Sequence, residues 1–147
     1  MAKLLREPLE GCEIQLASTD PSTGARVLFT GLVRADTNGA TTIALEYDAY
    51  EPMAITAMED LEAKALALFG VRRVLVIHRL GLVPVGQISV LALVESGHRK
   101  EAFAACEWLM NEVKKRVPIW KKEIGPNGEI WQHPLSGSLK PHSPESP

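Results

Sequence analysis

Apolar and polar residues alternate along several segments of this chain, and a period of two predicts β-strands with one buried face. Residues 41–50 alternate most clearly, so we expect a strand there that packs its apolar face against the core. That face holds Ile43, Leu45, Tyr47 and Ala49, and the opposite face holds Thr42, Glu46 and Asp48.

Further strands are predicted on both sides of this segment. Residues 87–96 are apolar on both faces at their centre, which indicates an interior strand. Residues 125–128, "GPNG", are typical of a hairpin turn. Residues 35–40, with an Asn-Gly pair, are expected to form a loop, and residues 83–86 a turn. The other strands are expected at residues 13–16, 25–34, 71–81, 119–124 and 129–133.

Two segments have apolar residues at helical spacing instead. Pro52 suits the first turn of a helix, where its missing N–H is tolerated, and Gly70 ends the first pattern. A second helix is expected from about Arg99 to Lys115, because Pro118 forbids its continuation. The first apolar stripe is Met53, Ala57, Met58, Leu61, Ala65 and Leu68, and the second is Ala102, Phe103, Cys106, Leu109, Met110 and Val113.

The predicted order of elements is β-β-β-α-β-β-α-β-β. Because the strands cluster and the helices are few, this order favours an α+β fold over a doubly wound α/β fold. A length of 147 residues with 46% hydrophobic residues suits one domain with a real core, which we place at residues 1–133. Residues 134–147 hold four prolines and four serines, so we expect a disordered tail there.

Charge and cysteine content narrow the possible functions. Sixteen basic and eighteen acidic residues give a net charge of -2, which argues against a protein whose main role is to coat nucleic acid. Cys12 and Cys106 lack the spacing of metal ligands, and Cys106 is expected to be a small buried residue. No apolar run approaches the roughly 20 residues of a membrane span, and no secretory signal is visible, so we expect a cytoplasmic protein.

Basic residues nevertheless stand at positions that could hold an anion. Arg34 ends an apolar strand, and His98 and Arg99 stand where the second helix begins. Cations are unfavourable at that end of a helix dipole, so either these side chains reach into water or they help to bind an anion. Lys114 and Lys115 stand at the other end, where the dipole alone is a sufficient explanation for them.

Lys121 is harder to explain as a solvated residue. Side chains alternate along a strand, so Lys121 shares one face with Glu123, while Trp120 and Lys122 share the other. A lysine in a partly dry pocket can have a lowered pKa and can act as a nucleophile or a proton donor. His78 shares a face with two valines and is expected to be a satisfied, half-buried histidine.

Four motifs taken together resemble the large, catalytic subunit of molybdopterin synthase. They are "LEYDAY", "HRLGLVPVG", "SGHRKEAF" and "VPIWKKE", and the matching stretches run through residues 24–131 in the order of that family. The resemblance implies an α/β hammerhead fold, with a mixed or antiparallel sheet and two main helices, that forms a homodimer. It also implies that each copy binds one small, ubiquitin-like sulfur-carrier subunit, which gives a heterotetramer.

The same resemblance implies a reaction. The carrier's C-terminal Gly-Gly tail ends in a thiocarboxylate and enters a pocket of the large subunit. Two sulfurs pass in succession to cyclic pyranopterin monophosphate, which becomes the dithiolene of molybdopterin. The family's large subunit needs no metal or other cofactor of its own, and no nucleic acid or membrane is expected as a partner.

Site residues are implied by their positions in these motifs. The resemblance implies that two lysines are catalytic. It also implies that these lysines, an arginine and a His-Arg pair bind the substrate. Three other residues are expected to orient a lysine or to line the pocket. The catalytic residues are Lys114 and Lys121, the further ligands are Arg34, His98 and Arg99, and the supporting residues are Glu123, Phe29 and Met110.

The chain departs from the family pattern at one point, and two other functions stay open. Some relatives carry an arginine just after the final Trp that reaches the neighbouring subunit's pocket; here His133 or Lys140 would have to replace it. One alternative is a non-catalytic adaptor that docks a ubiquitin-like partner. The other is a general anion- or nucleotide-binding module, which would tolerate arginine in place of Lys121 because the charge is kept.

Overall fold

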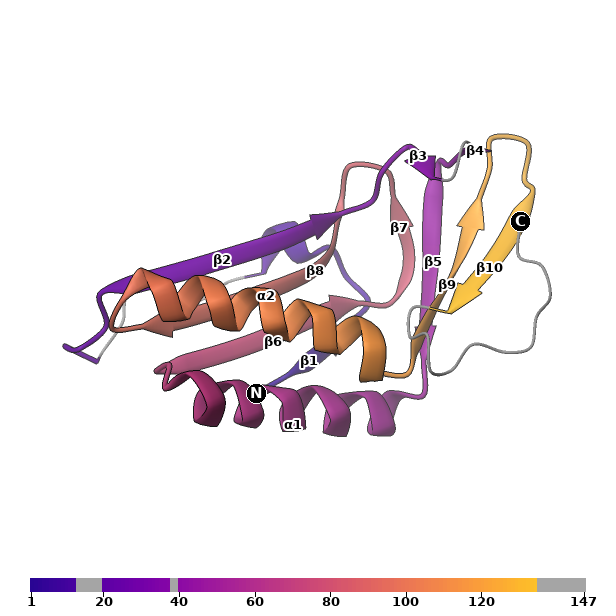
Figure 1. Ribbon diagram of the computed structural model, residues 1–147. Coiled ribbons are helices and arrows are strands. Elements are labelled where there is room, and N and C mark those ends of the chain that lie inside the picture. Colours follow the sequence, from indigo (N-terminus) through magenta and orange to yellow (C-terminus); the bar gives the residue numbers. More distant parts are fainter. Residues whose placement is uncertain (13–19, 38–39, 135–147) are drawn as a thin grey trace.

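Two four-stranded sheets and two helices make up the fold. The computed structural model describes residues 1–12, 20–37 and 40–134. The first sheet runs along the molecule with both helices on one of its faces, and the second sheet stands across one end (Figure 1). In spatial order the first sheet consists of β1 (Lys3–Leu5), β6 (Arg73–Arg79), β8 (Ile88–Ser96) and β2 (Ala25–Leu32).

Most neighbouring strands in the two sheets are antiparallel. Only the β1–β6 pair of the described strands is parallel, so the first sheet is mixed, whereas the second is antiparallel throughout. A 3₁₀ turn, η1 (Leu9–Gly11), follows β1, and β3 (Asp36–Thr37) pairs with β4 (Ala40–Thr41) as a short separate ribbon. The second sheet has the order β10 (Ile130–Pro134), β9 (Ile119–Ile124), β5 (Ala44–Ala49) and β7 (Gly81–Pro84).

The helices begin and end where the sequence chemistry requires. Helix α1 (Glu51–Phe69) has its proline in the first turn, and Gly70 closes it in the left-handed conformation, with φ of 65°. Helix α2 (Arg99–Arg116) ends just before Pro118, which cannot extend a helix. The ring centroids of Phe69 and Trp108 lie 5.8 Å apart where the two helices meet.

The main core lies between the helices and the sheets. The second sheet contributes one face to it, so the core is continuous from the long sheet to the end sheet. Burying each large aliphatic side chain contributes about 1.5–3 kcal/mol, so this cluster holds the end sheet against α2. Its larger members are Met58, Leu61, Val74, Val76, Val90, Leu109, Leu45, Tyr47, Val83 and Ile119. A smaller cluster of Leu9, Leu75, Ile77, Leu91 and Leu93 covers the other face of the first sheet.

The predicted α+β class is confirmed, and most of the predicted strands are present with bounds close to those expected. Two expectations about connections were wrong, and one strand was missed. Residues 35–40 were expected to be a loop but include β3 and part of β4. Residues 83–84, expected in a turn, belong to β7, because the proline stands at the end of the strand, where a missing donor is tolerated. Strand β1 was not predicted, because three residues are too few to show a period.

The predicted buried faces were partly wrong. On α1, Met53 and Leu68 are 61% and 64% exposed, and on α2, Phe103 is 61% exposed. Small residues take their places against the sheet, since Ala54 and Ala105 are fully buried and let the helices approach closely. The predicted apolar stripes were chosen from the large side chains. On each helix the stripe is therefore rotated about the helix axis relative to the face that packs against the sheet.

Residues 41–50 also differ from their predicted pattern at the first positions. Ile43 is half exposed, while Thr42 is buried, because the regular strand begins only at Ala44. Strand β10 continues to Pro134, one residue into the segment predicted as a tail. The predicted strand at residues 13–16 and the rest of the predicted tail lie outside the described residues.

Candidate functional site

A cavity of about 290 Å³ lies where the two sheets meet the C-terminal end of α2. Its volume is just below the range of roughly 300–1,000 Å³ that is typical of small-molecule sites. Gly31 leaves room on one wall: a Cβ atom there would lie 2.8 Å from Cγ1 of Val90. The lining consists of Phe29, Gly31, Leu32, Arg34, Leu45, Tyr47, His78, Ser89, Val90, Met110, Val113, Lys114, Ile119 and Lys121.

Three cations from separate elements line this cavity. Arg34 follows β2, Lys114 stands in the last turn of α2, and Lys121 lies on β9. Lys114 and Lys121 come together because the helix stops before Pro118 and the chain turns at once into β9. Arg34 and Lys114 are exposed, whereas Lys121 is half-buried, so the cavity has a positive mouth and one lysine further inside.

Lys121 is the cation whose protonation the site alters. Burial lowers its pKa from the ordinary 10.5, and the nearby charges of Lys114 and Arg34 lower it further, while the carboxylate of Glu123 acts in the opposite direction. These effects mean that Glu123, Lys114 and Arg34 are all close enough to influence the protonation of Lys121. A lysine with a lowered pKa gives up a proton more readily than a solvated lysine does.

Strand alternation explains why Lys121 faces the cavity and Lys122 does not. In the register of β5 and β9, Tyr47 stands directly opposite Lys121 and Leu45 opposite Glu123, so these four residues share the inner face. Lys122 stands opposite Glu46 on the outer face. The predicted division of this strand between two faces is confirmed.

Glu123 lies next to Lys121 on the inner face and is almost fully buried. Thr42 Oγ1 donates a hydrogen bond of 3.0 Å to its Oε1 atom. A buried carboxylate needs partners of this kind, and a fixed carboxylate next to Lys121 supports the charged form of that lysine. The predicted supporting position of Glu123 therefore has a structural basis.

The floor of the cavity is polar and buried. Tyr47, His78 and Ser89 have exposed fractions of 6%, 3% and 6%. The ring centroids of Tyr47 and His78 lie 4.9 Å apart in an edge-to-face contact, and Ser89 Oγ donates a hydrogen bond of 3.2 Å to the Gly31 carbonyl oxygen. Burial raises the pKa of Tyr47, so its hydroxyl keeps its proton.

His78 is buried more deeply than its pattern suggested. Burial lowers its pKa to about 4, although its hydrogen bond to the Arg79 carbonyl acts in the other direction. Nδ1 of His78 lies 2.8 Å from that carbonyl oxygen, so Nδ1 carries the proton of a neutral ring. The prediction of a satisfied histidine is confirmed, but the sequence did not show that it lines a cavity.

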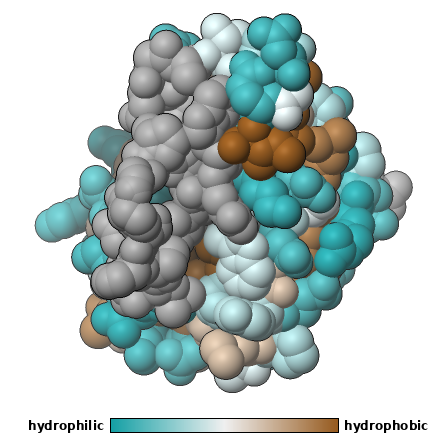
Figure 2. Space-filling model, turned by 90° about the vertical axis from the view of Figure 1, so that its right-hand side faces the viewer, coloured by the Kyte–Doolittle hydropathy of each residue, from teal (hydrophilic) through white to brown (hydrophobic). Residues whose placement is uncertain are grey.

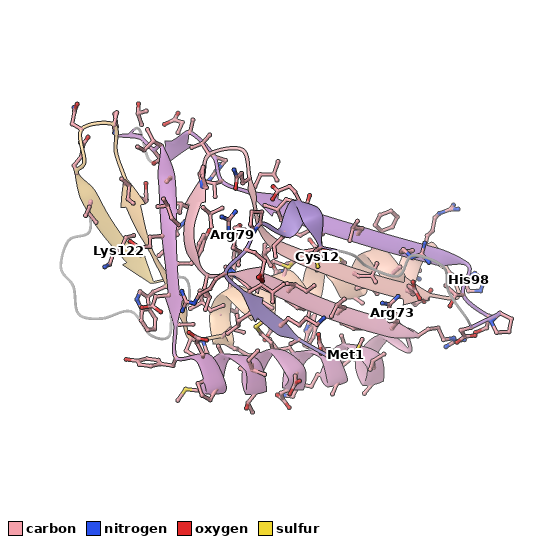
Figure 3. All side chains as sticks on the ribbon, turned by 180° about the vertical axis from the view of Figure 1, so that it is seen from behind. Met1, Cys12, Arg73, Arg79, His98 and Lys122 are labelled. Carbon is pink, nitrogen blue, oxygen red and sulfur yellow. The ribbon has the colours of Figure 1, made fainter. Side chains whose placement is uncertain are left out.

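His98 and Arg99 lie away from this cavity in the single chain. They stand at the start of α2, and the 15 residues from Arg99 to Lys114 span about 22 Å of helix. Figure 3 shows His98 and Lys122 at opposite ends of the molecule. His98 makes no side-chain cap to the helix, and both residues are exposed.

The remaining residues expected near the site divide into those that line the cavity and those without a described side chain. Phe29 and Met110 line the cavity, as expected for pocket residues. The backbone of His133 pairs with Lys121 in the β9–β10 register, but its side chain and all of Lys140 lie outside what the structure describes. Tyr47 and Ser89 were missed as cavity residues; for Tyr47, the only signal was its alternation with Leu45 on a strand.

The surface around the second sheet is mainly hydrophilic. Figure 2 shows this end of the molecule, where hydrophobic residues reach the described surface in only a few places. Within the described ranges, no group of three or more His, Cys, Asp or Glu side chains could hold a metal ion. Neither of the two described helices is long and apolar enough to cross a bilayer.

This α+β architecture places cations from a helix end and a strand around one partly dry cavity. Residues 4–116 match the family model described as MoaE protein. The chain therefore belongs to the MoaE protein family. It is similar to the molybdopterin synthase catalytic subunit of Pyrococcus abyssi, with 46% identity over 110 residues, which are 75% of this chain and 74% of that protein.

Solved structures share the fold. The X-ray structure of molybdopterin synthase from Staphylococcus aureus has a TM-score of 0.78 and 36% identity, and the match covers 88% of this chain and 96% of that one. A complex of subunits 1 and 2 of the molybdopterin-converting factor from Helicobacter pylori has a TM-score of 0.69 and 26% identity, over 99% of this chain and 93% of that one. The resemblance seen in the sequence motifs is thus confirmed at the level of family and fold.

Proposed function

We propose that this chain is the catalytic subunit of a molybdopterin synthase, a sulfurtransferase. A small, ubiquitin-like carrier brings sulfur as the thiocarboxylate at its C-terminus, and cyclic pyranopterin monophosphate accepts it. Two successive transfers produce the dithiolene of molybdopterin. The names of the relatives and of the similar solved structures support this activity, and the Helicobacter pylori complex supports a partner subunit.

The convergence of Arg34, Lys114 and Lys121 on one cavity carries the proposal. A thiocarboxylate and a cyclic phosphate are both anions, so they repel each other as they approach. Fixed positive charges in a site with little water offset that repulsion more strongly than they could in bulk solvent. A cavity with a positive mouth is therefore suited to holding both reactants at once.

The two lysines have different roles in this proposal. Lys114, in the exposed last turn of α2, donates a proton or holds the carrier's acyl group transiently after the sulfur has left. Lys121 is half-buried and has a lowered pKa, so it stabilises the developing negative charge and can exchange a proton. Glu123 fixes Lys121 from the same face of β9.

His98 and Arg99 complete the site from a second copy of the chain. They are exposed and lie about 22 Å along α2 from Lys114, too far to touch a ligand in the same chain's cavity. In a homodimer with twofold symmetry, each chain's His98 and Arg99 can face the partner's cavity. They then bind the phosphate group of the substrate as charge-assisted hydrogen-bond donors.

The activity is tested by mixing the protein with a thiocarboxylated carrier and cyclic pyranopterin monophosphate. Mass spectrometry then follows the sulfur from the carrier to the pterin product. We expect the wild type to convert the thiocarboxylate to a carboxylate and to form the dithiolene. Absence of the dithiolene, with a folded protein and an intact carrier, would contradict the proposed function.

Replacing lysine by arginine separates the enzyme from a simple anion-binding module. Lys121→Arg keeps the positive charge but cannot give up a proton, so we expect turnover to be lost. Lys122→Arg is the matched control, because Lys122 is next along the same strand but outside the cavity lining. Full turnover by Lys121→Arg would show that charge alone suffices at this position.

A further inference from the structure

Arg34 lines the cavity, but its guanidinium group has no side chain to hold it. Within residues 1–12, 20–37 and 40–134, it makes no ion pair and no side-chain hydrogen bond. Its backbone also lies outside the regular strands, because β2 ends at Leu32 and β3 begins at Asp36. The position of this cation therefore depends on the backbone hydrogen bonds of the residues on either side of it.

The residue before Arg34 is held by the turn between β7 and β8. The N–H of Gly86 donates to the carbonyl oxygen of Val33 over 2.9 Å, and the N–H of Val33 donates to the carbonyl oxygen of Gln87 over 3.1 Å. Gly86 has a φ of 89°, a conformation that glycine adopts without strain. Val33 is buried, so this reciprocal pair fixes the chain just before Arg34.

The residue after Arg34 is held from the second sheet. The N–H of Thr42 donates to the carbonyl oxygen of Ala35 over 2.7 Å. The side chain of Thr42 holds the carboxylate of Glu123. Arg34 is thus fixed from both sides, and on one side it shares its support with the carboxylate that acts on Lys121.

Arg79 holds the turn from the opposite side. Its Nη1 atom donates a hydrogen bond of 2.7 Å to Oε1 of Gln87, the residue whose carbonyl group holds Val33. Arg79 is only 8% exposed, and its Nε atom is buried without a partner among the described residues. Burying a cation with so few partners costs free energy, so the bond to Gln87 is the contact on which this charge depends.

We propose that Arg79 and Gln87 are positioning residues whose side-chain hydrogen bond holds the β7–β8 turn against Val33 and so sets the place of Arg34. This inference rests on the proposed function in one respect, because the anions that Arg34 then meets are the reactants of sulfur transfer. Neither residue of the Arg79–Gln87 pair is in the cavity lining, so the pair acts through Arg34.

Three variants isolate this hydrogen bond. Gln87→Leu removes the side-chain acceptor and keeps the backbone carbonyl that holds Val33. Gln87→Glu keeps an acceptor oxygen for Arg79 and is the conservative rescue. Asn111→Leu is the matched control, because it also replaces an amide by leucine, at an exposed position of α2 outside the cavity lining.

The first measurement is the exchange of backbone amide protons with solvent, followed by NMR in the full chain. We expect the Val33 amide to exchange about ten-fold faster in Gln87→Leu than in the wild type, because its acceptor is no longer fixed. The Leu93 amide, in the centre of β8, should keep its wild-type rate. Gln87→Glu and Asn111→Leu should match the wild type at both positions.

Equal acceleration at Val33 and Leu93 would show that the Arg79–Gln87 pair only stabilises the whole fold. An unchanged rate at Val33 would show that the pair does not hold this segment, and either result would overturn the proposal. Gln87→Leu leaves the Arg79 cation without its partner. If that variant does not fold, Arg79→Met decides the question, because it removes the buried charge and keeps an unbranched side chain.

The second measurement is the steady-state kinetics of dithiolene formation. We expect Gln87→Leu to raise the KM for cyclic pyranopterin monophosphate about ten-fold and to leave kcat within about two-fold, since a displaced Arg34 weakens anion binding. Arg34→Ala should have the same KM with and without Gln87→Leu, because the pair then has no cation to position. A further rise of KM in the double variant, or a wild-type KM in Gln87→Leu, would overturn the proposal.

The two measurements also separate this inference from the proposed function, because amide exchange needs no turnover. If Val33 exchange depends on Gln87 but the wild type forms no dithiolene, the sulfurtransferase fails and the positioning of Arg34 stands. If the wild type forms dithiolene and Gln87→Leu does so with an unchanged KM, the positioning role fails and the sulfurtransferase stands.

Discussion

Thr42 Oγ1 lies 3.0 Å from Oε1 of Glu123 and donates a hydrogen bond to it, although the two residues are 81 positions apart in the chain. Both side chains are buried. Thr42 precedes β5 and Glu123 lies on β9, so this bond links two neighbouring strands of the second sheet. It also fixes the carboxylate that acts on Lys121.

Removing this donor should destabilise the fold. Thr42→Val keeps the shape of the side chain but leaves a buried carboxylate oxygen without this partner, so we expect a loss of about 2 kcal/mol in the free energy of unfolding. Chemical denaturation at neutral pH measures it. Thr41→Val is the control, since Thr41 is exposed next to it. Equal unfolding midpoints for the two variants would show that the bond contributes nothing.

Lys121 should lose its proton at a lower pH in the folded protein than in the unfolded chain. Its amine can be labelled with an acylating reagent over a pH series and quantified by mass spectrometry, with urea-unfolded protein as the reference. Glu123→Gln should lower the pKa further, because it removes the one neighbouring charge that raises it, and Lys114→Ala should raise it. A pKa of 10.5 in the native protein would contradict the dry environment inferred for this lysine.

The lowered pKa of Lys121 determines the direction in which the free energy of unfolding changes with pH. Between the lowered pKa and 10.5, the unfolded chain binds a proton at Lys121 that the native chain has released. The free energy of unfolding contributed by this group therefore rises with pH across that window, and the penalty of burying the charged amine is fully present below it. Lys121→Met should flatten that part of the stability profile, whereas Lys122→Met should leave it unchanged.

His78 should make the fold sensitive to acid. Its native pKa is about 4 against 6.5 unfolded, so the unfolded chain takes up a proton first as the pH falls. The neutral ring contributes on the order of 3 kcal/mol to the free energy of unfolding above pH 6.5. This contribution is lost as the pH falls from 6.5 to about 4. Urea unfolding at pH 7 and near pH 4 should show a smaller difference for His78→Phe than for the wild type. His98→Ala, at an exposed histidine, should keep the wild-type difference; an unchanged difference in His78→Phe would contradict the burial argument.

Local chemistry explains which parts of the fold were predictable from the sequence. Pro52, Gly70 and Pro118 mark helix ends through backbone constraints that no tertiary contact overrides. The interior position of β8 followed from apolar residues on both faces. Strand β7 was missed because Gly81 and Pro84 are poor strand formers, and its pairing with β5 stabilises it across the chain.

The candidate site was predictable only in part. Alternation along β9 puts Lys121 and Lys122 on opposite faces, and this could be predicted from the sequence of that strand alone. The floor depends on Tyr47, His78 and Ser89, which come from three strands of two different sheets. Their convergence is set by how the sheets meet, and no local pattern encodes that. His98 was assigned to the site from its motif alone. The motif does not show its distance from the cavity, which follows from the length of α2.

Mixing two inactive variants tests the proposed contribution of a second copy. Arg99→Ala and Lys114→Ala should each be inactive alone, whereas random exchange of chains produces mixed dimers with one intact site. Half of the dimers are mixed, so we expect about a quarter of the wild-type activity to return. Two Arg99→Ala preparations mixed together are the control. No recovery, with chain exchange confirmed by native mass spectrometry, would show that Arg99 does not act across the dimer.

Sulfur transfer and carrier binding, measured in parallel for Lys114→Ala and Lys115→Ala, test the central claim most directly. The two lysines are adjacent at the end of α2, but only Lys114 lines the cavity. We expect Lys114→Ala to bind the thiocarboxylated carrier normally and to form no dithiolene, while Lys115→Ala does both. Wild-type turnover by Lys114→Ala would contradict the assignment of this cavity as the site of sulfur transfer.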